Sequence, residues 1–430
     1  MCPKGKKKCC RSLPLDVFSD LPENLIDAIL MCLPFKDTVR TSVLSKKWRY
    51  NWCRLPELTL DETGWTTNKD IIFCTSKITK IISHIVRLHA GPITKFILCV
   101  PRSWPKIHDL INFLSQNGIQ HLVLRRLSSV HQYKLPSSVF TCLQLRHLAL
   151  ESCFIHPPTV FKGFDCLTVL ELNHVESSDE FFRNLISNCL LLEPLVLDQP
   201  YCLNLVEIES PTLRSFVYAG LVHEVHLKKV PLLAKVSVTF SCSPTGVHAL
   251  AKFFECIPAL EHFRWCSMFR FFNNKAVEVP RRLSFALSCL KHLHINLVYL
   301  DELPELQGAL CLIRSSPYSQ DIEIQVYQRF QPDEYPKLLD PVTRDYVDEI
   351  PASFSDVTLN HLKAVKLEGI AGTRPEMQLI QLLLAKSPAL VRMKIDPYYG
   401  LEDKKSLKVV AEITNFQRAS SKAEVVDNVD

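Results

Sequence analysis

Histidines are the first residues in this 430-residue chain whose spacing could do chemistry. Residues 223–226 read His-Glu-Val-His, one residue short of the H-E-x-x-H zinc motif, so the two histidines are three apart and not four. His292 and His294 would share one face of an expected strand and could ligate a metal, but no third ligand has a fixed spacing from them. A metal-dependent enzyme that uses His292 and His294 therefore stays open as one hypothesis for the function.

The cysteines do not form a recognisable site either. The chain has 17 of them, none in a C-x-x-C pair, and none has an identifiable histidine partner. We expect reduced, mostly buried thiols of a cytosolic or nuclear protein. The sequence has no G-x-S-x-G elbow, no P-loop and only 11 glycines. It predicts no catalytic residue, no cofactor and no resident metal, and hence a protein that is not an enzyme.

Charge and hydropathy narrow the classes of partner. Fifty basic and 45 acidic residues give a net charge of +5, which is too balanced to favour nucleic acid. No apolar run is long enough for a membrane span. Residues 1–15 are basic but no apolar segment follows, so we expect a disordered tail; a weak nuclear signal or palmitoylation at Cys9 and Cys10 stays open. The expected location is the nucleus, the cytoplasm or both.

The elements that would position such side chains come from a repeated pattern, L-x-x-L-x-L. It recurs every 20 to 30 residues or so, which is typical of leucine-rich repeats. The copies, with substitutions, begin at Ile93, Ile119, Leu145, Leu167, Leu192, Leu213, Leu233, Leu260 and Leu290. Each copy predicts one short strand whose apolar face is buried only when the repeats stack into a solenoid. Amphipathic stretches between the strands, such as 181–191 and 247–257, are expected to form outer helices.

The same pattern assigns the faces of the sheet. The second and third apolar residues of each copy point inward, so the residues just before them lie on the concave face. Toward the end of the array these residues are basic or imidazole-bearing: Lys235, Arg264, His292 and His294. We therefore expect the concave face to bind the target, with an anionic element of the target near these side chains. The alternative is a solvated sheet face without a ligand.

The N-terminal region is helical in pattern. Asp20 can cap a helix that has Pro22 in its first turn and an apolar stripe from Leu25 to Leu33. A second short helix and a third, beginning at Ser45, are expected to follow. A unit of about 40 residues buries too little surface to be stable alone, so part of its apolar surface must meet the rest of the chain or a partner.

This region closely resembles the F-box of plant F-box proteins. The residues that carry the resemblance are Asp16–Ile26, Ile29-Leu30, Leu33-Pro34, Lys36-Asp37, Val39–Arg49 and Trp52. The resemblance implies a three-helix module that docks on the Skp-type adaptor of a cullin-based (SCF) ubiquitin ligase, and through it on a cullin and a RING protein. Carried over by position, the adaptor-binding residues are Leu21, Pro22, Leu25, Ile29, Leu33, Pro34, Val39, Val43, Leu44 and Trp48.

The C-terminal third breaks the repeat pattern and then resumes it. Residues 327–354 are polar and rich in proline, as expected of a linker. The strand–helix–strand pattern within 355–417 resembles the FBD region that follows leucine-rich repeats in plant F-box proteins. Residues 418–430 are expected to be disordered. With an F-box over 16–62 and repeats over 93–326, we expect an α/β fold: a three-helix F-box, an irregular leucine-rich-repeat horseshoe and an FBD-like cap.

Together these features predict the substrate-recognition subunit of an SCF-type ubiquitin ligase, with the F-box on the adaptor and the repeats on a target protein. The chain would act through proximity, with no side chain of its own in the chemistry. The alternative is a non-degradative scaffold that binds the adaptor but leaves its partners without ubiquitin.

Overall fold

The computed structural model describes residues 21–60, 74–100, 107–126, 132–201, 205–220, 225–240, 247–267, 280–328, 350, 357–399 and 403–427. The chain divides into two compact units, residues 1–128 and 129–430. The expected basic tail over 1–15, the first residues of the expected F-box and most of the expected linker lie outside the described residues.

The first unit opens with short helices: α1 (Glu23–Met31), α2 (Phe35–Arg40) and the 3₁₀ turns η1 (Thr41–Val43) and η2 (Asn51–Arg54). Pro22 and Pro34 occupy the N-cap positions of α1 and α2. The regular third helix expected from Ser45 is not formed, because residues 45–50 are turns that lead into η2. The packing of two indoles, Trp48 in the core and Trp52 edge-on to Phe35 at 6.0 Å, sets the path of this segment.

Three parallel strands complete the first unit. They are β1 (Glu57–Leu60), β2 (Lys95–Val100) and β3 (His121–Arg126), separated by helices α3 (Cys74–Leu88) and α4 (Ile107–Gln116). The repeat array was expected to begin at residue 93. A strand of the sheet already forms at β1, inside the segment assigned to the F-box, and buries Leu58 and Leu60.

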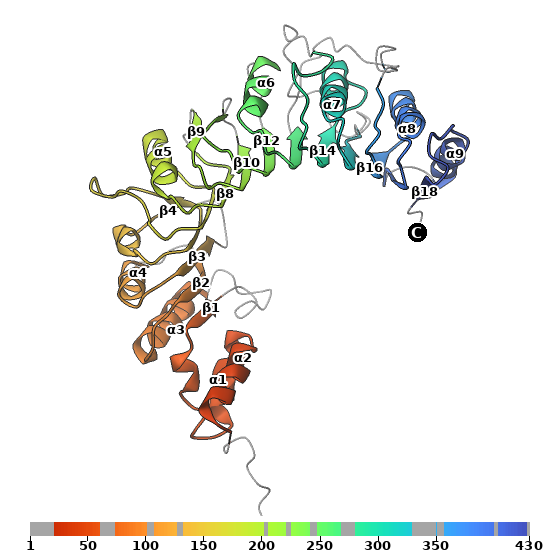
Figure 1. Cartoon of the computed structure of the whole chain (residues 1–430). Helices are drawn as coiled ribbons and strands as arrows, with labels where there is room; N and C mark the ends of the chain where they lie inside the picture. Colours follow the sequence, from red (N-terminus) through yellow and green to blue (C-terminus); the bar gives the residue numbers. More distant parts are fainter. Residues whose placement is uncertain are drawn as a thin grey trace, which may run out of the picture. The chain divides into compact units, whose positions relative to one another are not determined.

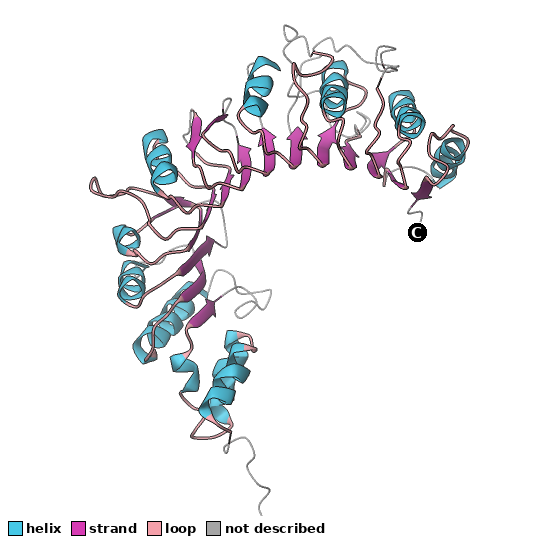
Figure 2. Ribbon diagram, viewed as in Figure 1, coloured by secondary structure: helices cyan, strands magenta, loops and turns pink. Residues whose placement is uncertain are grey.

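The second unit is a parallel sheet with helices along one of its sides (Figures 1 and 2). Its strands are β5 (His147–Glu151), β7 (Val169–Asn173), β8 (Pro194–Asp198), β10 (Ser215–Gly220), β12 (Lys235–Phe240), β13 (His262–Ser267), β14 (His292–Val298), β15 (Asp321–Val326), β16 (Ala364–Ile370), β17 (Arg392–Pro397) and β18 (Glu424–Asp427). The helices are η4 (Ser137–Thr141), α5 (Asp179–Asn188), α6 (Val247–Glu255), α7 (Leu303–Ser315), α8 (Arg374–Lys386) and α9 (Asp403–Thr414). Two short ladders, β4 (Tyr133–Lys134) with β6 (Cys153–Phe154) and β9 (Val206–Glu209) with β11 (Val225–Lys228), lie beside the main sheet.

The predicted alternation of faces is observed in strands such as β7, β8, β10, β13 and β15, whereas in β5 Ala149 between the two inward leucines is also buried. In β13, for example, Phe263 and Trp265 are at most 2% exposed, whereas Arg264 between them is exposed. Each such side chain contributes about 1.5 to 3 kcal/mol on leaving water, and only stacking against neighbouring repeats removes it from water. The inward residues thus form the core, and the residues between them form a second face, called here the open face, on the side of the sheet away from the helices.

Besides β1, two strands of the sheet were missed in the sequence, β15 and β18. The turn before β15 places Ser319, 2% exposed, where other repeats have a leading leucine, so the pattern was not recognised. The segment from residue 418, expected to be disordered, instead contains β18, which pairs in parallel with β17. Buried Ser420 donates a hydrogen bond to the carbonyl of Leu390 at 2.6 Å, which anchors this last repeat without a large apolar residue.

The FBD-like strand–helix–strand unit is present as β16, α8 and β17. Its helix begins with a capping box between Thr373 and Glu376. The carboxylate of Glu376, 1% exposed, accepts hydrogen bonds from the backbone N–H groups of Ala371, Gly372 and Thr373 at 2.7 to 3.0 Å and from the side chain of Gln328 at 2.6 Å. Glu376 therefore fixes the turn that joins β16 to its helix.

Candidate interaction surfaces

Helix α1 has a buried side and an exposed apolar side. Ile26 and Leu30 are at most 1% exposed, whereas Leu25 and Ile29, each one residue earlier, are 48% and 41% exposed. Leu25 and Ile29 are four apart and so share one face of the helix. Isolated exposed apolar residues are ordinary, but a group of large ones on one small unit indicates a binding surface.

The ten predicted adaptor-binding residues fall into three groups. The exposed ones are Pro22, Leu25, Ile29, Leu33, Pro34, Val43 and Leu44, and the half-buried ones are Leu21 and Val39. Trp48 is 2% exposed and belongs to the core of the first unit, so its assignment to the docking surface is corrected. Its size and its place in the motif favoured an anchor, but the turn that carries it directs the indole inward. Met31 and Tyr50, 57% and 60% exposed, are further apolar side chains that the sequence analysis did not select.

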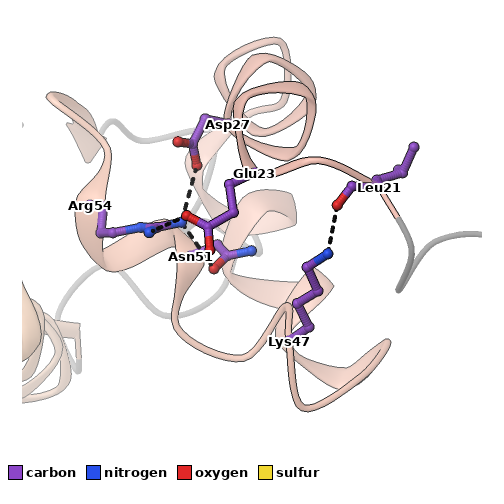
Figure 3. A network of polar contacts seen from close by, with 6 residues as sticks. All are labelled: Leu21, Glu23, Asp27, Lys47, Asn51 and Arg54. Atoms are coloured by element: carbon purple, nitrogen blue, oxygen red, sulfur yellow. Dashed lines mark hydrogen bonds and ion pairs between the residues drawn. The ribbon is translucent and has the colours of Figure 1, made fainter.

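Polar contacts hold the N-terminal end of α1 against the turns that follow α2 (Figure 3). The guanidinium of Arg54 lies 3.0 Å from the carboxylate of Glu23 and 3.8 Å from that of Asp27. The ammonium of Lys47 donates to the carbonyl of Leu21 at 2.6 Å. These exposed contacts each contribute at most about 1 kcal/mol, so they orient α1 rather than stabilise the unit strongly.

A buried hydroxyl fixes the junction of the first two helices. Thr38, 1% exposed, lies with its Oγ1 3.1 Å from the carbonyl of Leu30 and 3.2 Å from that of Pro34. The Leu30 carbonyl at the end of α1 thereby gains a hydrogen-bond donor from α2, and this contact holds the two helices together. The exposed residues of α1 and η1 are thus presented by a locally ordered framework.

The predicted target-binding residues lie side by side on the open face of the second unit. Lys235, Arg264, His292 and His294 come from three neighbouring strands, β12, β13 and β14. They line a half-open groove of about 320 Å³. A volume of this size is at the lower end of ligand clefts and suits a few side chains of a bound segment.

Two histidines form the floor of this groove. The imidazoles of His262 and His292 stack with centroids 4.2 Å apart and planes within 5° of parallel. Burial, followed by the charges of His292 and Lys235, lowers the pKa of His262, and burial, followed by the charge of Arg264, lowers the pKa of His294. His262 and His294 therefore favour the neutral form near neutral pH.

The metal hypothesis named His292 and His294, which lie two residues apart on β14. Across the described part of the chain, no three histidine, cysteine or acidic side chains lie close enough together to hold a metal ion. The short H-E-V-H stretch is only partly described, and His226 is exposed on β11.

Carboxylates from β15 make this part of the open face less basic than the sequence analysis predicted. Asp321 Oδ2 lies 2.7 Å from His292 Nδ1, and Glu323 Oε2 lies 3.4 Å from His294 Nδ1. The sequence analysis described this part of the face as basic because the repeat that carries the two acids had not been recognised. Farther along, Lys366 pairs with Glu368, and Lys394 lies 3.3 Å from Asp396, so acids lie beside the basic residues there as well.

The buried thiols have no features of nucleophiles. Burial raises the pKa of Cys142 to about 12, and burial is also the main cause that raises the pKa of Cys189 and of Cys311 to about 11. Because the thiolate is the reactive form, these groups are inert at neutral pH.

Comparisons with known proteins match both the helical N-terminal region and the repeats. A family model of the F-box domain matches residues 18–59, and a model of the leucine-rich repeats of FBD-associated F-box protein At5g56370 matches residues 107–252. A solved leucine-rich-repeat protein of Leptospira interrogans covers 80% of this chain and 85% of its own, with 16% identity and a TM-score of 0.40. No helix among the described residues is both long enough and apolar enough to cross a bilayer.

Full-length relatives match as well. The F-box/FBD/LRR-repeat protein At1g13570 of Arabidopsis thaliana is 30% identical over 421 residues, which cover 96% of this chain and 98% of the relative. The putative FBD-associated F-box protein At5g56440 of the same plant is 25% identical and covers 95% of this chain and 99% of its own. The match thus includes the helical unit, the repeats and the C-terminal strand–helix–strand unit, and the chain belongs to the F-box/FBD/LRR-repeat proteins.

Proposed function

We propose that this chain is the substrate-recognition subunit of an SCF-type ubiquitin ligase. The F-box binds a Skp-type adaptor, which links it to a cullin and a RING protein, and the repeats bind the target protein. The complex works in the nucleus, the cytoplasm or both. The single observation that carries the proposal is the exposed apolar surface of an F-box unit, on which Leu25 and Ile29 lie uncovered beside the buried Ile26 and Leu30.

The energetics fit a stable complex. Each large apolar side chain that leaves water on docking contributes about 1.5 to 3 kcal/mol, and a few such anchors normally dominate an interface. Leu25, Ile29, Leu33, Val43 and Leu44 are all more than one third exposed in the free chain. Helix-in-groove binding of this kind needs no charge on either partner.

The chain needs no catalytic group in this role. Ubiquitin is delivered by a conjugating enzyme on the RING protein, and the target gains rate from being held nearby in a fixed orientation. The inert buried thiols and the histidine pair are compatible with a non-catalytic subunit.

Isothermal titration of the purified full chain with a Skp-type adaptor tests the proposal. We expect submicromolar binding by the wild type and a loss of more than about a hundredfold for Ile29→Asp, because a carboxylate buried without a partner costs several kcal/mol. Val160→Asp is the matched control, since Val160 is 82% exposed in the second unit. Absence of binding by a folded wild type, or equal binding by Ile29→Asp and the control, would contradict the proposal.

The non-degradative scaffold differs in what happens after docking. In a reconstituted reaction with cullin, RING protein and conjugating enzyme, a recognition subunit transfers ubiquitin to its bound target, and deletion of residues 16–56 stabilises that target in cells. A scaffold retains its partners with neither effect. The two assays therefore separate the proposal from its alternative.

A further inference from the structure

The first residues of the main-sheet strands β10 to β16 form a row across the open face. In register, this row runs Ser215, Lys235, His262, His292, Asp321 and Ala364. It carries one ammonium and one carboxylate, separated by the two stacked imidazoles and flanked by uncharged residues. The row, called here the cross-strand row, is thus an electric dipole on the sheet surface and not a basic patch.

Both ends of the row are accessible to a partner. Lys235 is exposed, and no ion pair joins it to another described residue. The side chain of Asp321 is 38% exposed, and its Oδ2 lies 2.7 Å from Nδ1 of His292. A carboxylate can accept further hydrogen bonds, so Asp321 keeps the capacity to bind a cation.

In the middle of the row, the imidazoles of His262 and His292 stack 4.2 Å apart. Burial, followed by the charge of His292, lowers the pKa of His262, so His262 favours its neutral form. In the second row beside it, Arg264 on β13 and Glu323 on β15 lie on either side of His294, and Lys366 on β16 follows Glu323. Two adjacent rows therefore have the cation toward β12 and β13 and the anion toward β15.

The distance between the charged ends matches an extended peptide. Neighbouring strands are about 4.8 Å apart, so three spacings separate Lys235 from Asp321 by about 14 Å. An extended chain rises about 3.4 Å per residue, and its residues i and i+4 point to the same side about 14 Å apart. An acidic side chain and a basic side chain at this spacing would meet Lys235 and Asp321 together.

We infer that the open face binds an extended segment of the target that carries an acidic residue and a basic residue four positions apart, the acid over Lys235 and the base over Asp321. The inference rests on the proposed function, since it names the kind of target that the repeats select. A simple anion such as a phosphate would satisfy only the lysine end and would be repelled at the carboxylate end.

The test uses the purified full chain and four labelled peptides of equal length with uncharged β-favouring spacers. They carry, four residues apart, glutamate and lysine, two glutamates, two lysines or two glutamines. A central photo-crosslinking residue locates each peptide by mass spectrometry, and fluorescence anisotropy at low salt gives the affinities. We expect the glutamate–lysine peptide to bind about fivefold more tightly than either like-charged peptide, as one exposed ion pair permits, and to crosslink to β12–β15.

Charge-reversed variants sharpen the test. Lys235→Glu should transfer the preference to the two-lysine peptide, and Asp321→Lys should transfer it to the two-glutamate peptide, each by about fivefold. Both side chains are on the surface, so both variants are expected to fold. A glutamate–lysine peptide with its charges only two residues apart is the control for spacing.

Three outcomes would overturn the inference: a wild-type preference for the two-glutamate peptide, equal binding of all four peptides, or no crosslink within β12–β15 at millimolar peptide. The first outcome would make the groove a plain anion site. Because no adaptor or ubiquitin is present, these failures leave adaptor docking unaffected. A failure of the proposed function would show instead in the titration with the adaptor.

Discussion

The F-box surface and the open face of the repeats differ in the chemistry of their exposed side chains. On the F-box, Leu25, Ile29 and Val43 are exposed apolar side chains, which leave water only when a partner buries them. On the open face, His292 Nδ1 and Asp321 Oδ2 already lie 2.7 Å apart, so polar groups there are partnered within the chain. The first surface exposes apolar area to water, whereas on the second surface positive and negative charges nearly offset each other.

This difference indicates a division of labour. Burial of apolar anchors supplies affinity with little discrimination, which suits an adaptor shared by many F-box proteins. Charges arranged in a set order supply discrimination with little net affinity, because each exposed ion pair contributes about 1 kcal/mol or less. We therefore expect strong binding at the first surface and selective binding at the second.

The largest effect is expected from Trp48→Ala, which separates the core of the F-box from its docking surface. Removal of this buried indole should lower the free energy of unfolding of the first unit by about 3 to 5 kcal/mol. Adaptor binding should weaken only in proportion to the unfolded fraction. Circular dichroism during denaturant unfolding, with adaptor titration in parallel, measures both; a variant as stable as the wild type that no longer binds would return Trp48 to the docking surface.

The next effect concerns the scaffold behind the open face. Glu376→Ala removes the acceptor of three backbone N–H groups and of the Gln328 amide, and each buried donor left unpaired costs about 1 to 3 kcal/mol. We expect a loss of at least about 2 kcal/mol of stability and faster amide exchange in β16 and α8. Glu376→Gln keeps an acceptor oxygen and should lose less. Equal stability of the alanine variant and the wild type would show that water satisfies this turn.

Salt should distinguish the two surfaces directly. Raising the salt from about 0.05 M to about 0.5 M shortens the screening length from more than 10 Å to about 4 Å. The glutamate–lysine peptide should then lose about fivefold in affinity, whereas adaptor binding should change by less than about twofold. Parallel titrations at both salt concentrations measure the contrast. An adaptor affinity that falls as steeply as the peptide affinity would mean that charge, and not apolar burial, drives docking.

The smallest expected effect is a dependence of the stability of the second unit on pH. The pKa of His262 is lowered in the fold, so between its folded value and 6.5 the unfolded chain takes up the proton first. Stability from this group is therefore complete above pH 6.5 and is lost as the pH falls through the folded value. Its surroundings are Lys235, Glu261, Lys291 and His292. Denaturant unfolding from pH 8 to 5.5 should show a decline that His262→Gln reduces; an unchanged slope would assign the decline to other groups.

Much of the repeat architecture follows from the sequence because inward leucines recur at strand spacing. The leading residues at Leu145, Leu167 and Leu290, for instance, each precede a strand of the sheet. The copy at Leu55, Leu58 and Leu60, which forms β1, was not recognised although its leucines are buried. At β15 and β18 the pattern failed because no large apolar residue leads the strand. Ser319 fills the leading position before β15, and near β18 Ser420 and Ala423 are the buried groups.

The candidate sites were predictable in part. Spacing alone placed Lys235, Arg264 and His292 on one face, because alternation along a strand is strict. It could not show that Asp321 faces His292, since this contact depends on a repeat that has no leucine signal. Nor could a motif show that Trp48 points inward, because the depth of an indole depends on the turn that carries it.

The central claim is that one chain carries two independent surfaces, and a crossed experiment tests it most directly. Ile29→Asp, Lys235→Glu and the wild type are each titrated with the Skp-type adaptor and with the glutamate–lysine peptide. The account predicts that Ile29→Asp loses the adaptor and keeps the peptide, while Lys235→Glu keeps the adaptor and loses about fivefold in affinity for the peptide. A folded variant that lost both interactions would contradict the account, and so would a variant that lost neither. In either case the assignment of docking to the F-box surface and of selection to the open face would be wrong.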